Sequence, residues 1–527
     1  MRRYSVKVVQ EKEVTPASMT TTCIEPADTH TDSMPRIEWV GLLAIAAAVT
    51  LLHLLTNGRH GFHRDELQFL SDARHMDWGY VAYPPFTPVV ERISMALFGL
   101  SAVGLRLLSV LAQAGAIVVT GLMARELGGK RLAQATAALA VALSPLPLFE
   151  GTEFQYTTFD YLWWVLIAYF TIRLLRTDNP RWWLAIGAAA GMGLLTKYSI
   201  VFFIAGILAG VVLSRARTFL KSPWFYAGIA LAFLICLPNF LWQIQHHFIS
   251  YDFLQDIHAR DVRIGRTAGF LNDQIRICAN FFATPLWIAG LIAYLRNRRY
   301  RMLAWMYLVP VALLFFAKGR GYYPAAAYPM LLAMGAAVSE RWLATLPRWG
   351  RRTIETVFFA GVAAIGAYAV AILVPLAPSG PLRDFAMKNN GDLREEIGWE
   401  ELVQKVARIR DSLTPDERAH LGITTGNYGE YGAIDILGRA YGLPAPIGTT
   451  NSEWLRGYPA EAPTTLIVLG IGPEVADELF TGCRVAGHNG NAEGIHNEES
   501  DRHPFIFVCG PPRKPWAEIW KEHKDFG

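Results

Sequence analysis

Long apolar segments recur through the first 376 residues of this 527-residue chain, and they constrain its fold more than any other feature. A helix needs roughly 17–25 apolar residues to cross the hydrocarbon core of a bilayer. Only 18% of the residues are charged, below the ~25% usual for soluble domains. We therefore predict an α-helical polytopic membrane protein with about 11–13 transmembrane helices, eleven of them at 39–55, 103–123, 133–149, 157–175, 182–196, 199–213, 224–241, 280–295, 303–317, 324–341 and 354–376.

Basic residues cluster in alternate connections between these segments, and by the positive-inside rule those connections are cytoplasmic. The polar N-terminal tail, residues 1–38, is also basic and is expected on the same side. The opposite side then receives the large 57–100 loop, the Glu150–Tyr156 turn and everything after Pro375. The basic clusters are Arg125/Lys130/Arg131, Arg173/Arg176/Arg181, Arg215/Arg217/Lys221, Arg296/Arg298/Arg299/Arg301 and Arg348/Arg351/Arg352.

Residues 377–527 are more polar and alternate between helical and strand-like patterns. LREEIGWEELVQKVARIRDSL has apolar residues near helical period, whereas HLGITTG, TTLIVLGIG and HPFIFVCG have the pattern of short strands bounded by glycine. Alternation of this kind predicts a small soluble α/β domain of about 150 residues on the outer face. Cys483 and Cys509 both lie in this portion, where one disulfide bridge is possible.

Acidic residues stand at the outer ends of two apolar segments. The loop after the first segment, GFHRDELQFLSDARHMDWGYVAYPP, contains Asp65 and Glu66, and Asp160 lies at the outer end of 157–175. An ionisable residue at the edge of an apolar helix is costly and points to a functional site. We therefore interpret these three residues as catalytic. The alternatives are a helix-terminal charge for Asp65 and a structural pairing for Asp160.

Cationic residues also lie at membrane level. Lys197 stands between two apolar runs, and Lys318 and Arg320 open KGRGYYPAAAYP, which also contains Tyr322. Such residues usually pair with an anion, and phosphate is the obvious one in a lipid environment. The alternative is snorkelling of the side chains to the headgroups.

His60 and His63, beside the acidic pair, are weak candidates for a divalent metal, because their spacing matches no recognised ligand pattern. No cofactor is firmly implied, although a divalent metal is possible. The sequence contains no P-loop and no dinucleotide fingerprint, so nothing suggests ATP-driven transport. The net charge of +4 is small and spread out, which argues against a nucleic-acid partner.

The outer-loop motif HRDELQFLSDARHMDWGYVAYPP, Asp160, TKYS, SPWFYAGIALAFLICLPNFLWQIQ and KGRGYYPAAAYP together carry a family resemblance. The chain resembles bacterial GT-C glycosyltransferases of the ArnT-like and dolichyl-phosphate-mannose-protein mannosyltransferase superfamily (families 39 and 83). The resemblance covers most of residues 39–376. It implies a GT-C catalytic domain there, a polyprenyl-phosphate-linked sugar as donor, and a multi-pass protein of the bacterial inner membrane. Its N-terminus would be cytoplasmic and its C-terminal domain periplasmic.

The resemblance also implies residue roles. Asp65 matches the family's catalytic aspartate, with Glu66 as its neighbour in the motif, and Asp160 matches the second acidic position. The candidates for contact with the donor phosphate are Lys197, Lys318, Arg320 and Tyr322. The chain departs from the aminoarabinose transferases at one point, since Tyr83 stands where those enzymes carry an acidic residue.

The resulting hypothesis is an inverting membrane glycosyltransferase that moves a hexosyl or pentosyl group from a lipid-phosphate donor on the periplasmic side. The acceptor could be lipid A, another glycolipid, a cell-envelope glycan or a protein. The alternative is a transporter or flippase of lipid-linked glycans, which would predict internal repeats and interrupted helices. The outer α/β domain could also be a carbohydrate-binding or partner module.

Overall fold

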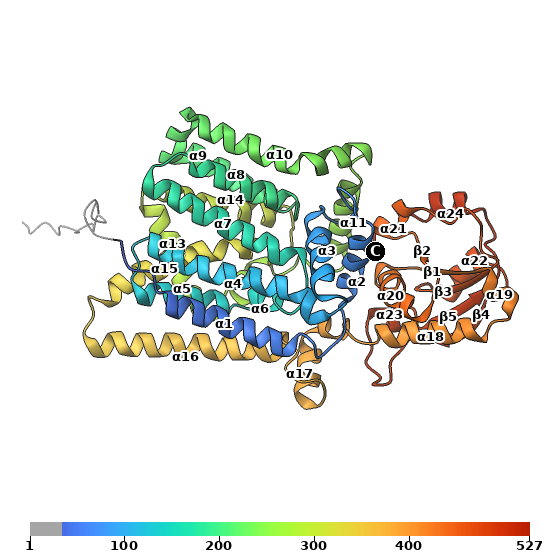
Figure 1. Ribbon diagram of the computed structural model, residues 1–527. Helices are drawn as coiled ribbons and strands as arrows, with labels where there is room; N and C mark the ends of the chain where they lie inside the picture. The colour runs from blue at the N-terminus through green and yellow to red at the C-terminus, as the bar shows by residue number, and fades with distance from the viewer. Residues whose placement is uncertain (1–33) are drawn as a thin grey trace, which may run out of the picture. The chain divides into compact units, whose positions relative to one another are not determined.

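The computed structural model describes residues 34–527, so nearly all of the predicted N-terminal tail, residues 1–38, lies outside the described residues. Residues 34–527 form one compact unit, which consists of a helical bundle followed by an α/β domain (Figure 1). The chain is therefore built as predicted, with a helical membrane part and a smaller mixed part.

Each of the eleven predicted apolar segments coincides with a helix. Five helices are long and apolar enough to cross a membrane, or up to seven spans if two bent helix pairs are each counted as one. The other six have 12–16 residues. In the predicted 133–149 segment, for example, Pro145 interrupts the helix because it lacks a backbone N–H. The eleven are α1 (Trp39–Thr56), α4 (Ala102–Glu126), α5 (Arg131–Ala142), α7 (Tyr156–Thr177), α8 (Trp182–Leu194), α9 (Ile200–Leu213), α10 (Pro223–Gln245), α13 (Thr284–Arg296), α14 (Arg301–Phe316), α15 (Tyr328–Leu343) and α16 (Arg348–Leu373).

The basic connections gather at one end of the bundle. The carboxylate of Glu126, at the end of α4, binds Arg173 at 3.1 Å and Arg176 at 2.5 Å, both from the end of α7. Arg299, in the connection between α13 and α14, donates to the Leu175 carbonyl at 2.6 Å. A shared end for these connections is what the positive-inside rule requires of cytoplasmic loops.

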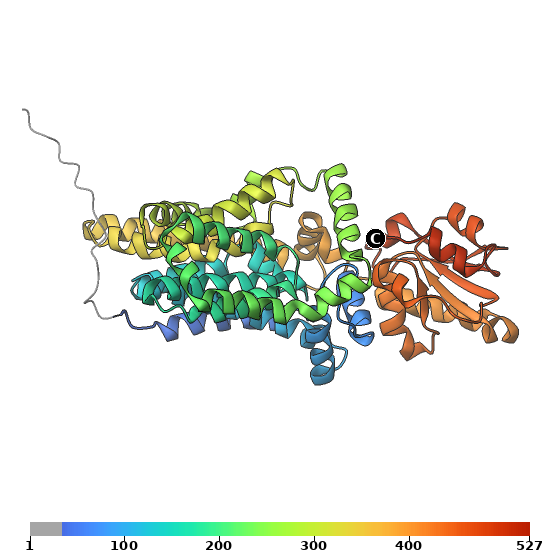
Figure 2. The same ribbon diagram turned by 90° about the horizontal axis from the view of Figure 1, so that it is seen from above.

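Short helices occupy the other end of the bundle, next to the α/β domain (Figures 1 and 2). Two of them lie within the 57–100 loop. The first, α2, is buried along most of its length, whereas α3 buries Glu91 and exposes the apolar Ile93 and Leu97. The short helices at this end are α2 (Arg64–Arg74), α3 (Phe86–Phe98), α6 (Pro145–Glu150), α11 (Ile249–Arg263), α12 (Phe270–Arg276) and α17 (Pro381–Asn389).

The α/β domain contains a five-stranded sheet in the order β2-β1-β3-β5-β4. β1 pairs in parallel with β2 and β3, whereas β5 is antiparallel to both β3 and β4. The three predicted strand patterns are confirmed as β1, β3 and β5, and the sequence analysis did not place β2 and β4. The strands are β1 (Leu421–Thr425), β2 (Pro446–Gly448), β3 (Thr465–Leu469), β4 (Arg484–His488) and β5 (Phe505–Cys509).

Helices cover both faces of this sheet. Ile467 and Leu469 of β3 pack with α18 and α20, and Leu466 and Val468 pack with α22 and α24 on the opposite face. Because neighbouring strand residues point to opposite faces, β3 must be apolar throughout, and all five of its residues are buried. The disulfide considered from the sequence is present between Cys483 and Cys509. The helices are α18 (Trp399–Ser412), α19 (Pro415–Ala419), α20 (Tyr428–Leu437), α21 (Asn451–Arg456), α22 (Pro473–Leu479), α23 (Glu498–Arg502) and α24 (Trp516–Glu522).

Candidate active site

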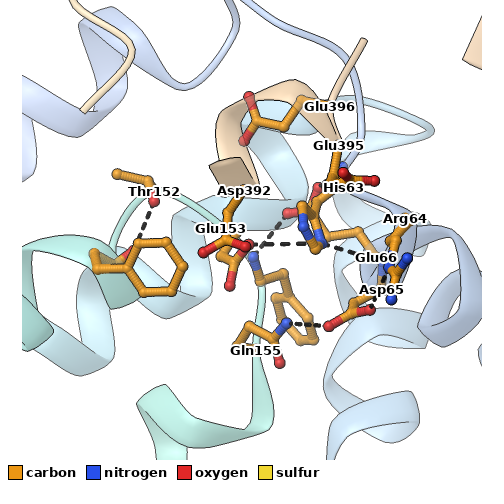
Figure 3. Close-up of polar contacts among 12 residues, drawn as sticks. His63, Arg64, Asp65, Glu66, Thr152, Glu153, Gln155, Asp392, Glu395 and Glu396 are labelled. Atoms are coloured by element: carbon orange, nitrogen blue, oxygen red, sulfur yellow. Dashed lines mark hydrogen bonds and ion pairs between the residues drawn. The ribbon is translucent and has the colours of Figure 1, made fainter. Parts of the chain in front are cut away.

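Asp65 lies in the first turn of α2, and two residues from distant parts of the chain hold its carboxylate. The side-chain amide of Gln155 donates to Oδ2 at 2.8 Å, and the hydroxyl of Tyr428 donates to Oδ1 at 3.0 Å. Figure 3 shows the Gln155 side chain directed at Asp65. The Asp65 side chain remains 31% exposed. The carboxylate is therefore fixed in direction but still open to an incoming group.

The start of α2 separates the two neighbouring acidic side chains. His63 is the N-cap residue: its ring Nδ1 accepts from the backbone N–H of Asp65 at 3.2 Å, while its own N–H donates to Glu66 at 2.8 Å. This reciprocal arrangement is a capping box, which fixes where a helix begins. With the helix start fixed, Asp65 stands at the surface of the turn and Glu66 points inward.

The charges around Asp65 keep it ionised. Burial raises the pKa of this carboxyl, but the neighbouring His63 and Arg64 side chains and the hydrogen bonds from Gln155 and Tyr428 outweigh burial, so that the pKa lies below its ordinary value. Conversely, burial and the charge of Asp65 raise the pKa of the Tyr428 hydroxyl well above its ordinary value. Tyr428 therefore stays a neutral donor to an anionic Asp65.

Glu66 is completely buried and paired with an equally buried arginine, Arg106 of α4. The guanidinium donates to both carboxylate oxygens, from Nε at 2.8 Å and from a terminal nitrogen at 2.7 Å. The backbone N–H groups of His63 and Phe154 complete the set at 2.8 Å and 2.7 Å. A carboxylate with four donors and no exposure holds α2, α4 and the 150–156 turn together, and it presents no free oxygen to a substrate.

Asp160 and Lys197 line one small pocket at the outer end of α7, together with Glu150, Tyr322 and Tyr323. The Asp160 carboxylate accepts from the indole N–H of Trp164 at 3.1 Å and from the Ser199 hydroxyl at 3.3 Å. Asp160 is therefore buried and hydrogen-bonded, but it faces the same pocket as the lysine.

The ammonium group of Lys197 is surrounded by aromatic rings. It lies 4.6 Å from the ring centre of Tyr323, 5.2 Å from that of Tyr156 and 5.9 Å from that of Tyr322. Tyrosine faces attract cations through the ring quadrupole. Among the salt bridges of residues 34–527, none involves Lys197. Its charge is thus held in place while remaining available to an anion.

The turn that precedes α7 joins the two groups of residues. Gln155 holds the Asp65 carboxylate, and the next residue, Tyr156, places its ring over Lys197. Asp65 and the Lys197 pocket therefore lie on either side of one junction of the chain. A substrate that contacts both would lie across the Gln155–Tyr156 peptide.

The other cationic candidates differ in their placement. Arg320 donates two hydrogen bonds to Asp261, at 2.6 Å and 2.9 Å, and a third to the Tyr322 hydroxyl at 3.3 Å. It is therefore next to the Lys197 pocket but already paired with a carboxylate. Lys318 is exposed and does not line the pocket. Lys197 and Tyr322 line the same pocket, and Arg320 contacts that pocket through the Tyr322 hydroxyl. Lys318 does not line the pocket.

The two histidines do not form a metal site together. His60 Nδ1 lies 3.1 Å from Glu396. His63 Nδ1 instead lies 3.6 Å from Glu153 (Figure 3). Within residues 34–527, no group of three or more His, Cys, Asp or Glu side chains is arranged to hold a metal ion.

Four residues of the site were not identified from the sequence: Gln155, Tyr428, Arg106 and Glu153. Tyr428 belongs to the α/β domain, and no local pattern links it to the first outer loop. Glu153 is buried near Asp392 and Asp65, and burial with these neighbouring charges raises its pKa well above the ordinary value. The one available signal was that the 150–156 turn falls on the same side as Asp65.

Known proteins share both sequence and fold with this chain. The family model described as dolichyl-phosphate-mannose-protein mannosyltransferase matches residues 82–242. The lipid A galacturonosyltransferase RgtD of Rhizobium johnstonii is 25% identical over 365 residues, which are 67% of this chain and 74% of the relative. An undecaprenyl phosphate-alpha-4-amino-4-deoxy-L-arabinose arabinosyl transferase of Pseudomonas fluorescens is 29% identical over 46% of each chain.

Among solved structures, ArnT from Cupriavidus metallidurans in the apo state matches with a TM-score of 0.54 at 17% identity, covering 89% of this chain and 97% of ArnT. The same protein bound to undecaprenyl phosphate matches with a TM-score of 0.53 at 15% identity, covering 89% and 98%. This chain has the GT-C membrane fold seen in ArnT. Because the match covers 89% of this chain, it extends beyond the helical bundle into the α/β domain.

Proposed function

We propose that this ArnT-like protein is an inverting glycosyltransferase that moves a sugar from a polyprenyl-phosphate donor to a hydroxyl or amine acceptor. One observation carries the proposal: the ionised, partly exposed Asp65 and the ammonium of Lys197, which makes no salt bridge within residues 34–527, lie on either side of the Gln155–Tyr156 junction. A base and a phosphate-binding cation in this arrangement are what a single displacement at an anomeric carbon requires.

In the proposed reaction, Asp65 accepts the proton of the acceptor as its oxygen or nitrogen bonds to the anomeric carbon. The bond between that carbon and the phosphate oxygen breaks at the same time. The leaving group is a polyprenyl phosphate monoester, which is a stable anion at neutral pH and needs no proton. It needs positive charge instead, and Lys197 supplies it, with Arg320 nearby.

The remaining acidic residues have supporting roles in this proposal. Glu66 is a positioning residue that holds the start of α2 through Arg106, so that Asp65 keeps its direction. Asp160 shares the pocket of Lys197 and adds a carboxylate beside that ammonium group. These assignments replace a direct catalytic role for Glu66 and Asp160.

The relatives guide the choice of substrates. Their printed names describe transfer of galacturonosyl and aminoarabinosyl groups, one of them to lipid A and the other from undecaprenyl phosphate. We propose a hexuronosyl or pentosyl undecaprenyl phosphate as donor and a glycolipid as acceptor. The Tyr83 hydroxyl donates to Asp72 in this chain, and the acidic residue that the aminoarabinose transferases carry at this position is absent.

We further propose that the protein lies in a bacterial inner membrane with the active end in the periplasm. The Cys483–Cys509 disulfide supports this orientation, because disulfides form and persist in oxidising compartments. The basic connections at the opposite end of the bundle support it as well.

The test uses the full chain in lipid vesicles with a panel of polyprenyl-phosphate sugars and a glycolipid acceptor. The proposal predicts a glycosylated product for at least one donor, with inverted anomeric configuration. If the protein moved labelled donor across the vesicle membrane and formed no product with any donor, the transporter interpretation would replace it.

A further inference from the structure

A cavity of about 360 Å³ lies in the α/β domain, away from Asp65 and Lys197. It lies beside the carboxyl ends of two parallel strands, where Thr424 and Thr425 end β1 and Val468 and Leu469 end β3. Thr449, just after β2, adds a third hydroxyl-bearing residue. Its size is at the lower end of the range for small-molecule sites.

The strand order of the sheet reverses at the position of this cavity. The chain runs from β1 outward to β2 on one side, and then returns to β3 on the other side of β1. The order therefore reverses between β1 and β3, and in open α/β sheets ligands bind at such a reversal, outside the carboxyl ends of the strands. The cavity lies at that reversal.

Two buried polar atoms of cavity-lining residues have no partner. The Thr425 side chain is 4% exposed and the Trp516 side chain 6%, and neither Oγ1 of Thr425 nor the indole N–H of Trp516 makes a hydrogen bond within the described residues. Buried polar atoms of proteins are nearly always paired. Thr425 pairs with Leu469 and shares its α18 and α20 face, whereas Trp516 packs with Val468 on the opposite face, which lines the cavity. A ligand with hydroxyl groups in the cavity would therefore supply an acceptor to the Trp516 indole.

The rest of the lining indicates the class of ligand. Val468, Leu469 and Ile519 are apolar, whereas the rim carries Lys524 among the acidic Glu522 and Asp525. A strongly anionic ligand such as a nucleotide would meet more negative than positive charge at this rim. A sugar ring, with an apolar C–H face and a hydroxyl-bearing edge, fits both parts of the lining.

We propose that this cavity is a saccharide-binding site that holds one or two neutral sugar units. The site is separate from the glycosyl-transfer site and does not require the transfer reaction. Its rim is nevertheless close to that site in the fold: Asp525 pairs through its backbone with Thr449 and Asn451, and Gly527, two residues later, packs against the ring of Tyr428. The domain would then bind a glycan next to the carboxylate that acts on it.

The test measures saccharide binding to the full chain in lipid nanodiscs by saturation-transfer difference NMR. The probes are methyl glucoside, N-acetylglucosamine, maltose and UDP. Val475 lines the cavity on α22 and is 40% exposed, so Val475→Trp should fill the entrance without disturbing the core. Val485→Trp is the matched control, because Val485 is 51% exposed on β4 and does not line the cavity.

We expect at least one saccharide to give a signal with the wild type and with Val485→Trp, and none with Val475→Trp. Trp516→Phe keeps an aromatic ring and removes the unpartnered indole N–H, so affinity should fall about tenfold for one lost hydrogen bond. It also serves as the decisive variant if Val475→Trp does not fold. Asp65→Asn should bind saccharide as the wild type does, which separates this site from the active site.

Three results would overturn the proposal. The first is the absence of a signal from every saccharide with the folded wild type. The second is undiminished binding to both Val475→Trp and Trp516→Phe. The third is binding of UDP in preference to the saccharides, which would make the cavity a nucleotide site.

Discussion

The hydroxyl of Tyr428 lies 3.0 Å from Oδ1 of Asp65, although 363 positions separate the two residues in the chain. The α/β domain therefore contributes directly to the site in the first outer loop. Arg64 strengthens the same junction: its guanidinium lies 5.1 Å from the centre of the Tyr428 ring and binds Glu498 of α23 at 2.5 Å. The domain is thus part of the active end of the protein rather than an appendage.

Tyr428→Phe should shift the pH dependence of transfer. The Tyr428 hydrogen bond lowers the pKa of Asp65, so its removal raises that pKa. The base must be ionised, and activity is lost as the pH falls through its pKa. The acid limb of the kcat/KM profile should therefore move to higher pH. At pH values above this limb, kcat/KM should fall by about tenfold or less.

Tyr458→Phe is the matched control for this measurement, because Tyr458 is exposed in the same domain and packs on Trp520, away from Asp65. Its profile should overlay that of the wild type. An unchanged acid limb in Tyr428→Phe, with both variants folded, would mean that Tyr428 does not tune the base.

Arg106→Met should destabilise the protein. It leaves Glu66 buried without its partner, and breaking a buried ion pair from one side costs about 3–5 kcal/mol. The melting temperature in detergent should fall clearly. The double variant Glu66→Leu/Arg106→Met should recover part of the loss, because no unpaired carboxylate remains at position 66. If the double variant were less stable than Arg106→Met, the unpaired Glu66 carboxylate would not be the cause of the lost stability.

Lys197→Met should weaken use of the donor. Removing the charge from the tyrosine-lined pocket takes away the stabilisation of the leaving phosphate, with an expected loss of about 100-fold in kcat/KM for the donor. Lys388→Met changes an exposed lysine of α17 in the same way and should lie within twofold of the wild type. Lys318→Met tests the lysine that does not line the pocket. If it lowered kcat/KM for the donor as much as Lys197→Met does, this pocket would not be the phosphate site.

Much of the fold could be predicted because hydropathy and periodicity are local properties. The eleven apolar segments all became helices, and the strand patterns ending at Thr425, Leu469 and Cys509 became strands. The lengths of the spans were less predictable. Breaks such as the one at Pro145 divide apolar segments that appear continuous by composition.

The site was only partly predictable because its partners are distant in sequence. Asp65 and Glu66 are adjacent and chemically alike, and only the buried Arg106 decides that Glu66 turns inward. Likewise, Lys197 and Lys318 are both lysines at membrane level, but only Lys197 meets the three tyrosine rings. No sequence pattern marks Gln155 or Tyr428, because the role of a neutral hydrogen-bond donor depends on the group it contacts in the fold.

The central claim is that Asp65 takes the proton of the acceptor. The most direct measurement is single-turnover sugar transfer by Asp65→Asn in vesicles, with binding of polyprenyl-phosphate sugar measured on the same preparation. The account predicts donor binding close to that of the wild type and a loss of about 100-fold or more in the rate of transfer, because a general base contributes 10²–10⁴-fold. Transfer at the wild-type rate by Asp65→Asn would contradict the account and move the base elsewhere, to Asp160 first.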